Sequence, residues 1–347
     1  MATMFGREWS QADLLARVGD LSQVGGVKLC QWDDGVERGL RVAEVRTGSG
    51  LEFTVLLDRG LDLGPASYRG IPLAWLSPAG FAHPAFYEPE GAGWLRTFGG
   101  GLMTGCGLTS LGAPCEDEGE ALGVHGRLSH LPARHVQADE VWTGDAASVY
   151  RGAFRVTGDL RQARIFGENL RLTRRITAWL GESRIAIHDT VENLADTRSP
   201  LMILYHINLG FPLLDEDATL VAPPHPVKPR DADAEPGIAD WMHFQDPTPG
   251  YREQVFNHDL ASDAGGWAAM KLVNPRLGIA VSVRHRKRTL PNLVQWKMMG
   301  QGAYVLGLEP SNCDTLGRAN ERARGTLQFI EPGERREFEV EILVEEV

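Results

Sequence analysis

The sequence predicts an all-β protein, a sandwich or barrel built from many short strands. The first observation is that 40 glycines and 20 prolines are spread along the 347 residues, so that turns recur throughout the chain. The second is that the runs between them are short, rich in Val, Ile, Leu and Thr, and often alternate apolar with polar residues. Short alternating segments separated by turn residues are typical of β-sandwiches and β-barrels.

A short helix is expected only near the N-terminus. Ser10 is a suitable N-cap, and Leu14, Leu15 and Val18 recur at helical spacing, so we expect a helix over residues 10–18 within an N-terminal extension of residues 1–25. Strands are then expected at residues 27–32, 39–46, 52–57, 183–191, 201–209, 277–283, 293–299, 303–309, 325–330 and 337–344.

The C-terminal turn has a clear chemical basis. Pro332 fixes its own φ and Gly333 accepts a positive φ, so Glu331-Pro332-Gly333-Glu334 is expected to join the last two strands as a hairpin.

Two other segments lack the alternation of apolar and polar residues that is typical of strands. Residues 78–112 are rich in Gly, Pro and aromatic residues, and residues 223–263 are polar with many Asp and Pro. We interpret both as long loops over the mouth of one β domain that spans residues 1–347.

Composition excludes several classes of function. The chain carries 35 Lys and Arg against 46 Asp and Glu, a net charge of −11, which disfavours a nucleic-acid partner. It contains no apolar run of about 18 residues, the length of a membrane span, and no signal-peptide core in residues 1–26, so a cytoplasmic location is expected. The four scattered cysteines (Cys30, Cys106, Cys115 and Cys313) are expected to be free thiols.

Two histidine segments are candidates for chemistry. In Gly123-Val124-His125-Gly126-Arg127, the flanking glycines allow backbone or ligand to approach His125 closely, although a histidine bonded within its own turn is the alternative. In Leu204-Tyr205-His206-Ile207-Asn208, both His206 and Asn208 point to one face of an apolar strand. Two polar groups there need partners, which a ligand or a satisfied protein core would supply.

A carboxylate completes the set. Glu309 ends an apolar strand, because Pro310 is expected to stop it, and the same-face neighbour Gly307 leaves space beside the carboxylate. Such a glutamate either pairs with a cation or acts on a substrate. Two imidazoles and one carboxylate on separate strands form an acid–base pair with a positioning group.

Other chemistries fit the sequence less well. No Gly-x-Ser-x-Gly nucleophile elbow occurs, and the run at residues 99–101 lacks the strand and helix of a dinucleotide loop. The spacing of Cys106, Cys115, His125 and His130 matches no compact zinc pattern. We therefore expect no metal and no cofactor.

The order of the motifs resembles the galactose mutarotase-like (aldose 1-epimerase) superfamily, over nearly the whole chain from residue 39 to residue 344. The motifs are Asp58-Arg59-Gly60, Tyr68-Arg69-Gly70-Ile71-Pro72-Leu73, His125-Gly126, Val191-Glu192-Asn193 with Pro200, Tyr205-His206, Glu309-Pro310 and Pro332-Gly333-Glu334. The chain looks closest to a poorly characterised bacterial branch with Asp-Arg-Gly and His-Gly-Arg motifs.

The resemblance implies a mostly antiparallel β-supersandwich with an open cleft across a curved sheet. It also implies that Glu309 is the general base for the anomeric hydroxyl, that His206 is the general acid for the ring oxygen, and that His125 holds and polarises the sugar. Removing the O1 proton while protonating the ring oxygen opens the hemiacetal, and closure on the other face gives the other anomer. No metal or redox cofactor is needed.

Two departures from the family pattern concern the substrate. The familiar Asn-Arg pair is replaced by Trp94-Leu95-Arg96, and the familiar His-Gly-Gly is His-Gly-Arg, which adds Arg127 beside the expected cleft. Together with Arg59, these arginines favour a sugar that carries a carboxylate, sulfonate or phosphate, because Arg binds such groups bidentately. For each arginine alone, a surface or ion-paired role is the alternative. Asn208 is the fourth expected substrate ligand.

The sequence therefore predicts a cofactor-independent sugar epimerase that binds a small-molecule sugar; it does not indicate the oligomeric state. One alternative is an isomerase or epimerase that acts away from the anomeric carbon through an enediol. A second is a carbohydrate-binding module without catalysis, which has no need of both His206 and Glu309. A third is a polysaccharide lyase with a tyrosine base such as Tyr87, Tyr205 or Tyr304.

Overall fold

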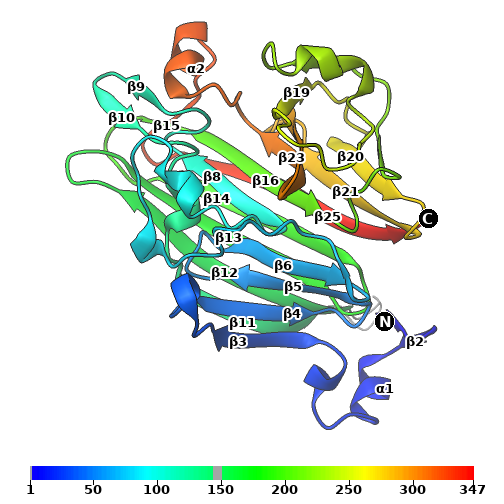
Figure 1. The fold of residues 1–347 in the computed structure, drawn as a ribbon. Helices are drawn as coiled ribbons and strands as arrows, with labels where there is room; N and C mark the ends of the chain where they lie inside the picture. Colours follow the sequence, from blue (N-terminus) through cyan, green and yellow to red (C-terminus); the bar gives the residue numbers. More distant parts are fainter. Residues whose placement is uncertain (1, 144–150) are drawn as a thin grey trace.

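The computed structural model describes residues 2–143 and 151–347, and its described part consists of two large, stacked antiparallel sheets (Figure 1). Among the described residues the first sheet has eleven strands, in the order β18-β19-β22-β23-β16-β8-β6-β5-β4-β3 with β7 paired to β6. Its strands are β3 (Gly26–Gln31), β4 (Arg41–Arg46), β5 (Leu51–Leu56), β6 (Asp62–Tyr68), β7 (Ile71–Pro72), β8 (Met103–Leu108), β16 (Met202–Gly210), β18 (Val227–Pro229), β19 (Gln254–His258), β22 (Asn292–Gly300) and β23 (Ala303–Ser311).

Within residues 2–143 and 151–347, the second sheet has eight strands in the order β11-β12-β13-β14-β25-β21-β20-β17. They are β11 (Arg134–Thr143), β12 (Arg151–Ala163), β13 (Asn169–Trp179), β14 (Arg184–Asn193), β17 (Thr219–Val221), β20 (Trp267–Asn274), β21 (Ile279–Arg286) and β25 (Arg335–Glu346). Three two-stranded sheets complete the strands: β1 (Ala2–Met4) with β2 (Arg7–Trp9), β9 (Cys115–Asp117) with β10 (Glu120–Leu122), and β15 (Ser199–Pro200) with β24 (Phe329–Ile330).

Helices are short and peripheral. The predicted N-terminal helix is present as α1 (Gln11–Leu15), although it ends at Leu15 and does not reach Val18 as expected. The Ser10 side chain caps it together with Asp13. The second α-helix, α2 (Arg318–Arg324), ends at Gly325, which has a φ of +70°. The 3₁₀ turns in the described part of the chain are η1 (Leu21–Gln23), η2 (Gly35–Glu37), η3 (Pro84–Phe86), η4 (Gly93–Arg96), η5 (Leu128–His130) and η6 (Glu235–Asp240). No helix in the described ranges is long and apolar enough to cross a membrane.

Strand alternation places the main core between the two sheets. On β14, Ile185, Ile187 and Asp189 are buried and the intervening residues are partly exposed. On β16 the odd-numbered residues, including Tyr205 and Ile207, join the inter-sheet core. The even-numbered residues therefore point to the outer face of the eleven-stranded sheet.

A buried charged network connects the two sheets beneath this face. The fully buried Arg174 guanidinium donates to Asp189, with Nη2 and Oδ2 2.7 Å apart, and its Nη1 lies 3.2 Å from Asp62 Oδ1 in the other sheet. The Tyr205 hydroxyl also donates to Asp189 at 2.7 Å. Because every partner is buried, removing one of them leaves a charge without compensation.

Two sequence expectations about the C-terminal segment are wrong. The turn at Pro332-Gly333 exists, with Gly333 at a φ of +74°, but it is not a hairpin, because β24 pairs with β15 whereas β25 pairs with β14 and β21. Of the strand expected at residues 325–330, only Phe329–Ile330 is a strand, since Gly325 caps α2.

The two expected long loops are also shorter than predicted. Residues 78–112 contain β8, a central strand whose sequence Met-Thr-Gly-Cys-Gly-Leu has little β-branched character. Residues 223–263 contain β18 and β19 at one edge of the same sheet. Pairing with neighbouring strands outweighs weak local preference in both places.

Candidate active site

His206 lies on β16 and Glu309 on β23. These two strands are neighbours near the centre of the large sheet (Figure 1). The antiparallel register, which pairs Leu204 with Ser311, places His206 opposite Glu309. The His206 Nε2 and Glu309 Oε1 atoms lie 3.2 Å apart, and both side chains are buried. The imidazole and the carboxylate that the sequence singles out thus meet on the outer face of one sheet.

Gly307 provides the space that this pair occupies. A Cβ atom at this position would lie 2.5 Å from Glu309 Oε1 and 3.3 Å from His206 Cε1. The expectation that Pro310 ends the strand is wrong, because β23 continues through it to Ser311. A proline lacks only its own N–H, and the remaining bonds of this ladder hold the strand in place.

His125 approaches the pair from the turn that follows β10. Its backbone has a φ of +56°, and its carbonyl accepts a hydrogen bond from Gly107 N at 3.0 Å. A Cβ on Gly126 would lie 2.4 Å from the carbonyl oxygen of Ser110, so glycine is required where this turn passes β8. The His125 ring stands edge-on to the His206 ring, with centroids 5.9 Å apart.

The three side chains line one cavity of about 400 Å³. Aromatic rings form much of its wall: the Phe98 and Trp296 centroids lie 5.3 and 5.4 Å from that of His206, and Trp94 lies 4.8 Å from His125. The other lining residues are Leu95, Gly112, Ala113, Val124, Arg230, Asp231, Glu253, Val255, Val294, Thr315 and Leu316. A cavity with apolar walls and a few convergent polar groups is the usual form of a small-molecule site.

Several polar atoms in and beside this cavity lack partners in the protein. His125 Nδ1, His206 Nδ1, Thr315 Oγ1 and Glu309 Oε1 are buried and make no hydrogen bond; the 3.2 Å contact of Glu309 Oε1 with His206 Nε2 is an ion-pair contact only. Buried polar atoms are satisfied in the great majority of cases, so four exceptions in one cavity indicate a place for a polar ligand.

Burial shifts the pKa values of all three groups toward their neutral forms. It raises the pKa of Glu309 to about 8, and the nearby positive charge of Arg230 opposes this rise. Burial lowers the pKa of His206 to about 3, with a further contribution from His125, and lowers the pKa of His125 to about 4, with a contribution from Arg230. Such shifted values are common at catalytic sites.

The sequence analysis missed the ion-pair cluster on one wall of the cavity. Arg230 Nε donates to Asp231 at 2.7 Å, and Arg230 Nη2 donates to Glu253 at 3.0 Å. The indole Nε1 of Trp296 donates to the other oxygen of Glu253 at 2.8 Å. No sequence spacing connects these residues. The only sequence signal for this cluster was that its three charged residues lie in the polar segment 223–263.

The structure does not bring the three expected arginines to this cavity. Arg59 is buried elsewhere and donates to the carbonyl groups of Ala82 and Thr97. Arg96 is exposed and pairs with Glu88 at 3.3 Å.

The other expected ligands also lie outside the lining. Arg127 lies against the Tyr87 ring, 5.9 Å from its centroid, beside a different hollow. Asn208 is fully buried next to the cavity, where its amide donates to the carbonyl groups of Gly101 and His206. Asn208 therefore supports the strand that carries His206.

The tyrosines proposed for a lyase are engaged elsewhere. Tyr87, Tyr205 and Tyr304 donate their hydroxyl groups to Gly126, Asp189 and Gln245 respectively, and none lines the cavity. Within residues 2–143 and 151–347, no three His, Cys, Asp or Glu side chains group as a metal site.

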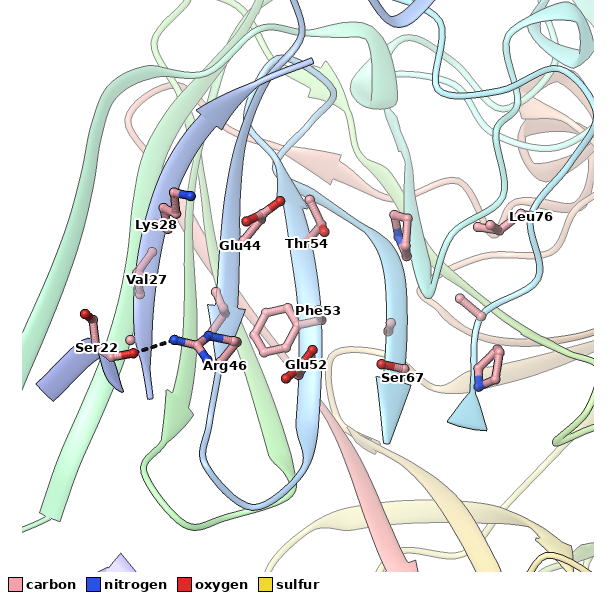
Figure 2. Close-up of a pocket in the computed structure, with 16 residues that line it drawn as sticks. Ser22, Val27, Lys28, Glu44, Arg46, Glu52, Phe53, Thr54, Ser67 and Leu76 are labelled. Atoms are coloured by element: carbon pink, nitrogen blue, oxygen red, sulfur yellow. Dashed lines mark hydrogen bonds between the residues drawn. The ribbon is translucent and has the colours of Figure 1, made fainter. Parts of the chain in front are cut away.

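A larger hollow of about 790 Å³ lies on the same sheet face, over β3, β4, β5 and β6 (Figure 2). Its charges alternate in sign: the strand register places Lys28 opposite Glu44 and Arg46 opposite Glu52. Figure 2 shows these side chains along neighbouring strands, with Arg46 bonded to the carbonyl of Ser22. No histidine lines this hollow, so it lacks the acid–base pair of the smaller cavity.

Comparison with known proteins places the chain in a family. Residues 37–344 match the family model of a domain of unknown function, DUF4432. The chain belongs to this family. No curated protein sequence matches it.

Solved structures establish a galactose mutarotase-like fold. A putative aldose 1-epimerase from Klebsiella pneumoniae is 26% identical and superposes with a TM-score of 0.85, covering 92% of this chain and 83% of that chain. A galactose mutarotase-like protein from Clostridium acetobutylicum is 11% identical, with a TM-score of 0.61 and coverage of 93% and 99%. A putative aldose 1-epimerase from Escherichia coli K12 is 12% identical, with a TM-score of 0.52 and coverage of 86% and 97%. The resemblance predicted from the motifs is confirmed at the level of the fold.

Proposed function

We propose that this protein is a sugar 1-epimerase that interconverts the anomers of an aldose by acid–base ring opening and closure. The observation that supports this most directly is the buried pair His206 and Glu309, 3.2 Å apart in a cavity of about 400 Å³ and each with a polar atom that no protein group satisfies. The similarity in fold to putative aldose 1-epimerases agrees with this proposal.

The pair has the chemistry for one concerted exchange of protons. In the proposal, Glu309 takes the proton from O1 while His206 gives a proton to the ring oxygen, and the bond from C1 to the ring oxygen breaks. The open aldehyde rotates about its C1–C2 bond, and the reverse transfers close the ring on the other face. His125, whose ring lies 5.9 Å from that of His206, holds the sugar and polarises it.

The pKa values define where the proton rests before the reaction. With a pKa of about 8 for Glu309 and about 3 for His206, the pair holds one proton at neutral pH, and that proton is on Glu309. The two atoms lie 3.2 Å apart, so a small rotation of either side chain when a sugar binds aligns them and passes the proton to His206. A single transfer then prepares both the acid and the base.

The charge of the cavity favours a neutral sugar over an acidic one. Arg230 is the one positively charged residue among the described lining residues, and Asp231 and Glu253 already pair with it. Arg59, Arg96 and Arg127, which led us to expect an acidic substrate, lie outside this cavity. An added carboxylate or phosphate would meet the exposed carboxylates without a free cation to balance it.

The test is a screen of aldoses for faster anomer exchange, by polarimetry and NMR. For the sugar that responds, Glu309→Gln and His206→Asn should each lower turnover about 10²–10⁴-fold while calorimetry shows that the sugar still binds. The losses should not add in full, because one step needs both groups. Glu44→Gln, on the same sheet face but in the other hollow, is the control and should have wild-type turnover.

Two outcomes would contradict the proposal. Near wild-type turnover by Glu309→Gln would make this residue a structural carboxylate. Sugar binding by the wild-type protein without any acceleration of anomer exchange would identify a carbohydrate-binding module.

A further inference from the structure

A second polar cavity, of about 690 Å³, lies beside the candidate active site on the same sheet face. The two cavities are lined by successive same-face residues of the same strands. On β19, Val255 lines the active-site cavity and Asn257 lines the second. On β22, Val294 lines the active-site cavity and Asn292 lines the second. Residues two apart on a strand share a face, so the cavities are neighbouring parts of one surface.

The strand register gives the distance between the catalytic pair and this second cavity. Glu309 pairs with Val294, Val294 pairs with Asn257, and Asn257 pairs with Lys228. At ~4.8 Å between strands, Asn257 is roughly 10 Å from Glu309 and Lys228 roughly 14 Å. A ring joined to the reacting sugar would therefore reach these side chains.

The side chains nearest the active site in this cavity are free to bind a ligand. Within the described ranges, Lys228, Asn257 and Asn292 make no side-chain hydrogen bond or ion pair. The other charged side chains of the cavity that are not fully buried are paired. Lys287 pairs with Asp259 at 2.6 Å. Farther from the catalytic pair, Arg324 pairs with Asp314 at 3.0 Å.

The composition of the lining favours hydroxyl groups over an anion. The lining contains three cations and three carboxylates, so no excess positive charge draws in a phosphate: these are Lys228, Lys287, Arg324, Asp259, Asp314 and Glu321. The two free amides each offer both donors and an acceptor, and a sugar hydroxyl needs both.

We propose that this second cavity is a subsite for a second sugar ring, so that the substrate is the reducing-end sugar of an oligosaccharide; this rests on the proposed function. The reducing ring occupies the cavity of His206 and Glu309, and the next ring binds Asn257, Asn292 and Lys228. The active-site cavity of about 400 Å³ holds one ring, and the 690 Å³ cavity holds the next.

The experiment compares glucose with the reducing disaccharides maltose, cellobiose, lactose and melibiose, and galactose with a disaccharide that ends in galactose, all by polarimetry. We expect at least one disaccharide to have a kcat/KM at least tenfold above that of its reducing-end monosaccharide. Asn257→Ala and Lys228→Ala should each raise the KM for that disaccharide about five- to tenfold, with kcat unchanged and monosaccharide kinetics unaffected. Lys28→Ala, an exposed lysine in the other hollow on the same face, should change neither.

The outcomes separate the subsite from the proposed function. Turnover of monosaccharides with no preference for any disaccharide, or equal effects of Asn257→Ala on both kinds of sugar, would overturn the subsite and leave the epimerase proposal intact. If no sugar is turned over, the epimerase proposal has failed, and calorimetry still tests the subsite. Tighter binding of a disaccharide than of its monosaccharide, weakened by Asn257→Ala, then supports the subsite, and equal binding overturns it.

Discussion

Replacing Glu309 by glutamine should stabilise the fold, because the folded protein holds this carboxyl group in its protonated form. Its pKa is raised from the ordinary 4.5 to about 8, chiefly by burial. The unfolded chain therefore loses this proton near pH 4.5, whereas the folded protein keeps it until pH 8. Stability from this group is fully present below pH 4.5 and is lost as the pH rises toward 8.

The magnitude follows from the interval over which only the unfolded chain is ionised. Between pH 4.5 and pH 7, at ~1.4 kcal/mol per pH unit, the free energy of unfolding falls by about 3 kcal/mol. Glutamine has nearly the same shape and no proton to lose, so Glu309→Gln should recover about 3 kcal/mol at pH 7 and almost nothing at pH 4.5. With an unfolding entropy of ~2.1 cal/mol/K per residue, this is a rise in Tm of about 4 °C for a chain of this length.

The assay is thermal and urea unfolding of the wild type, Glu309→Gln and Glu44→Gln from pH 4.5 to pH 8.5. The gain from Glu309→Gln should grow with pH, whereas Glu44→Gln, in an exposed position, should show no such trend. The reasoning is refuted if Glu309→Gln is less stable than the wild type at pH 7. That sign would mean that Glu309 is ionised and pairs with a protonated His206, since removing one partner of a buried ion pair costs about 3–5 kcal/mol.

Two further substitutions test residues that hold the candidate active site and the sheets beneath it in place. Gly307→Ala would place a Cβ 2.5 Å from Glu309 Oε1, so it should lower anomer exchange at least tenfold with an unchanged circular dichroism spectrum; wild-type exchange would mean that the carboxylate position is not critical. Arg174→Leu should lower the free energy of unfolding by about 3–5 kcal/mol in urea, because Asp189 loses its buried partner. Arg38→Leu, in an exposed ion pair, is its control and should change stability little, and equal effects of the two would argue against the buried network.

The local sequence pattern was sufficient to predict which way the side chains of the candidate site point where they lie on regular strands. Alternation along β16 placed His206 on the face opposite the core residue Tyr205, and Glu309 on β23 had an open neighbour in Gly307. The glycines around His125 signalled the close backbone approach that the turn makes. In each case a short-range rule determines which way the side chain points.

Long-range contacts could not be inferred in this way. Arg230 and Glu253 are 23 residues apart and meet only because β18 and β19 form an antiparallel pair at the sheet edge. The arginines 59, 96 and 127 lie near glycines and histidines in sequence, yet each finds a carbonyl, carboxylate or aromatic partner outside the cavity. Arginine has several ways to satisfy its charge, and sequence proximity does not distinguish between them.

The charge balance of the cavity also bears on which reaction it supports. In the proposed anomer exchange, Glu309 gains a proton as His206 loses one, and the sugar remains neutral, so the total charge in a poorly hydrated cavity stays constant. An enediol route removes a proton from carbon, and negative charge builds up on the carbonyl oxygen to the extent that this slow transfer runs ahead of protonation by His206; that charge needs a free cation or several donors. Arg230 is the one lining cation among the described residues, and Asp231 and Glu253 already pair with it. The cavity therefore suits exchange at the anomeric carbon better, because there both protons move between oxygen and nitrogen atoms and less charge builds up for the cavity to solvate.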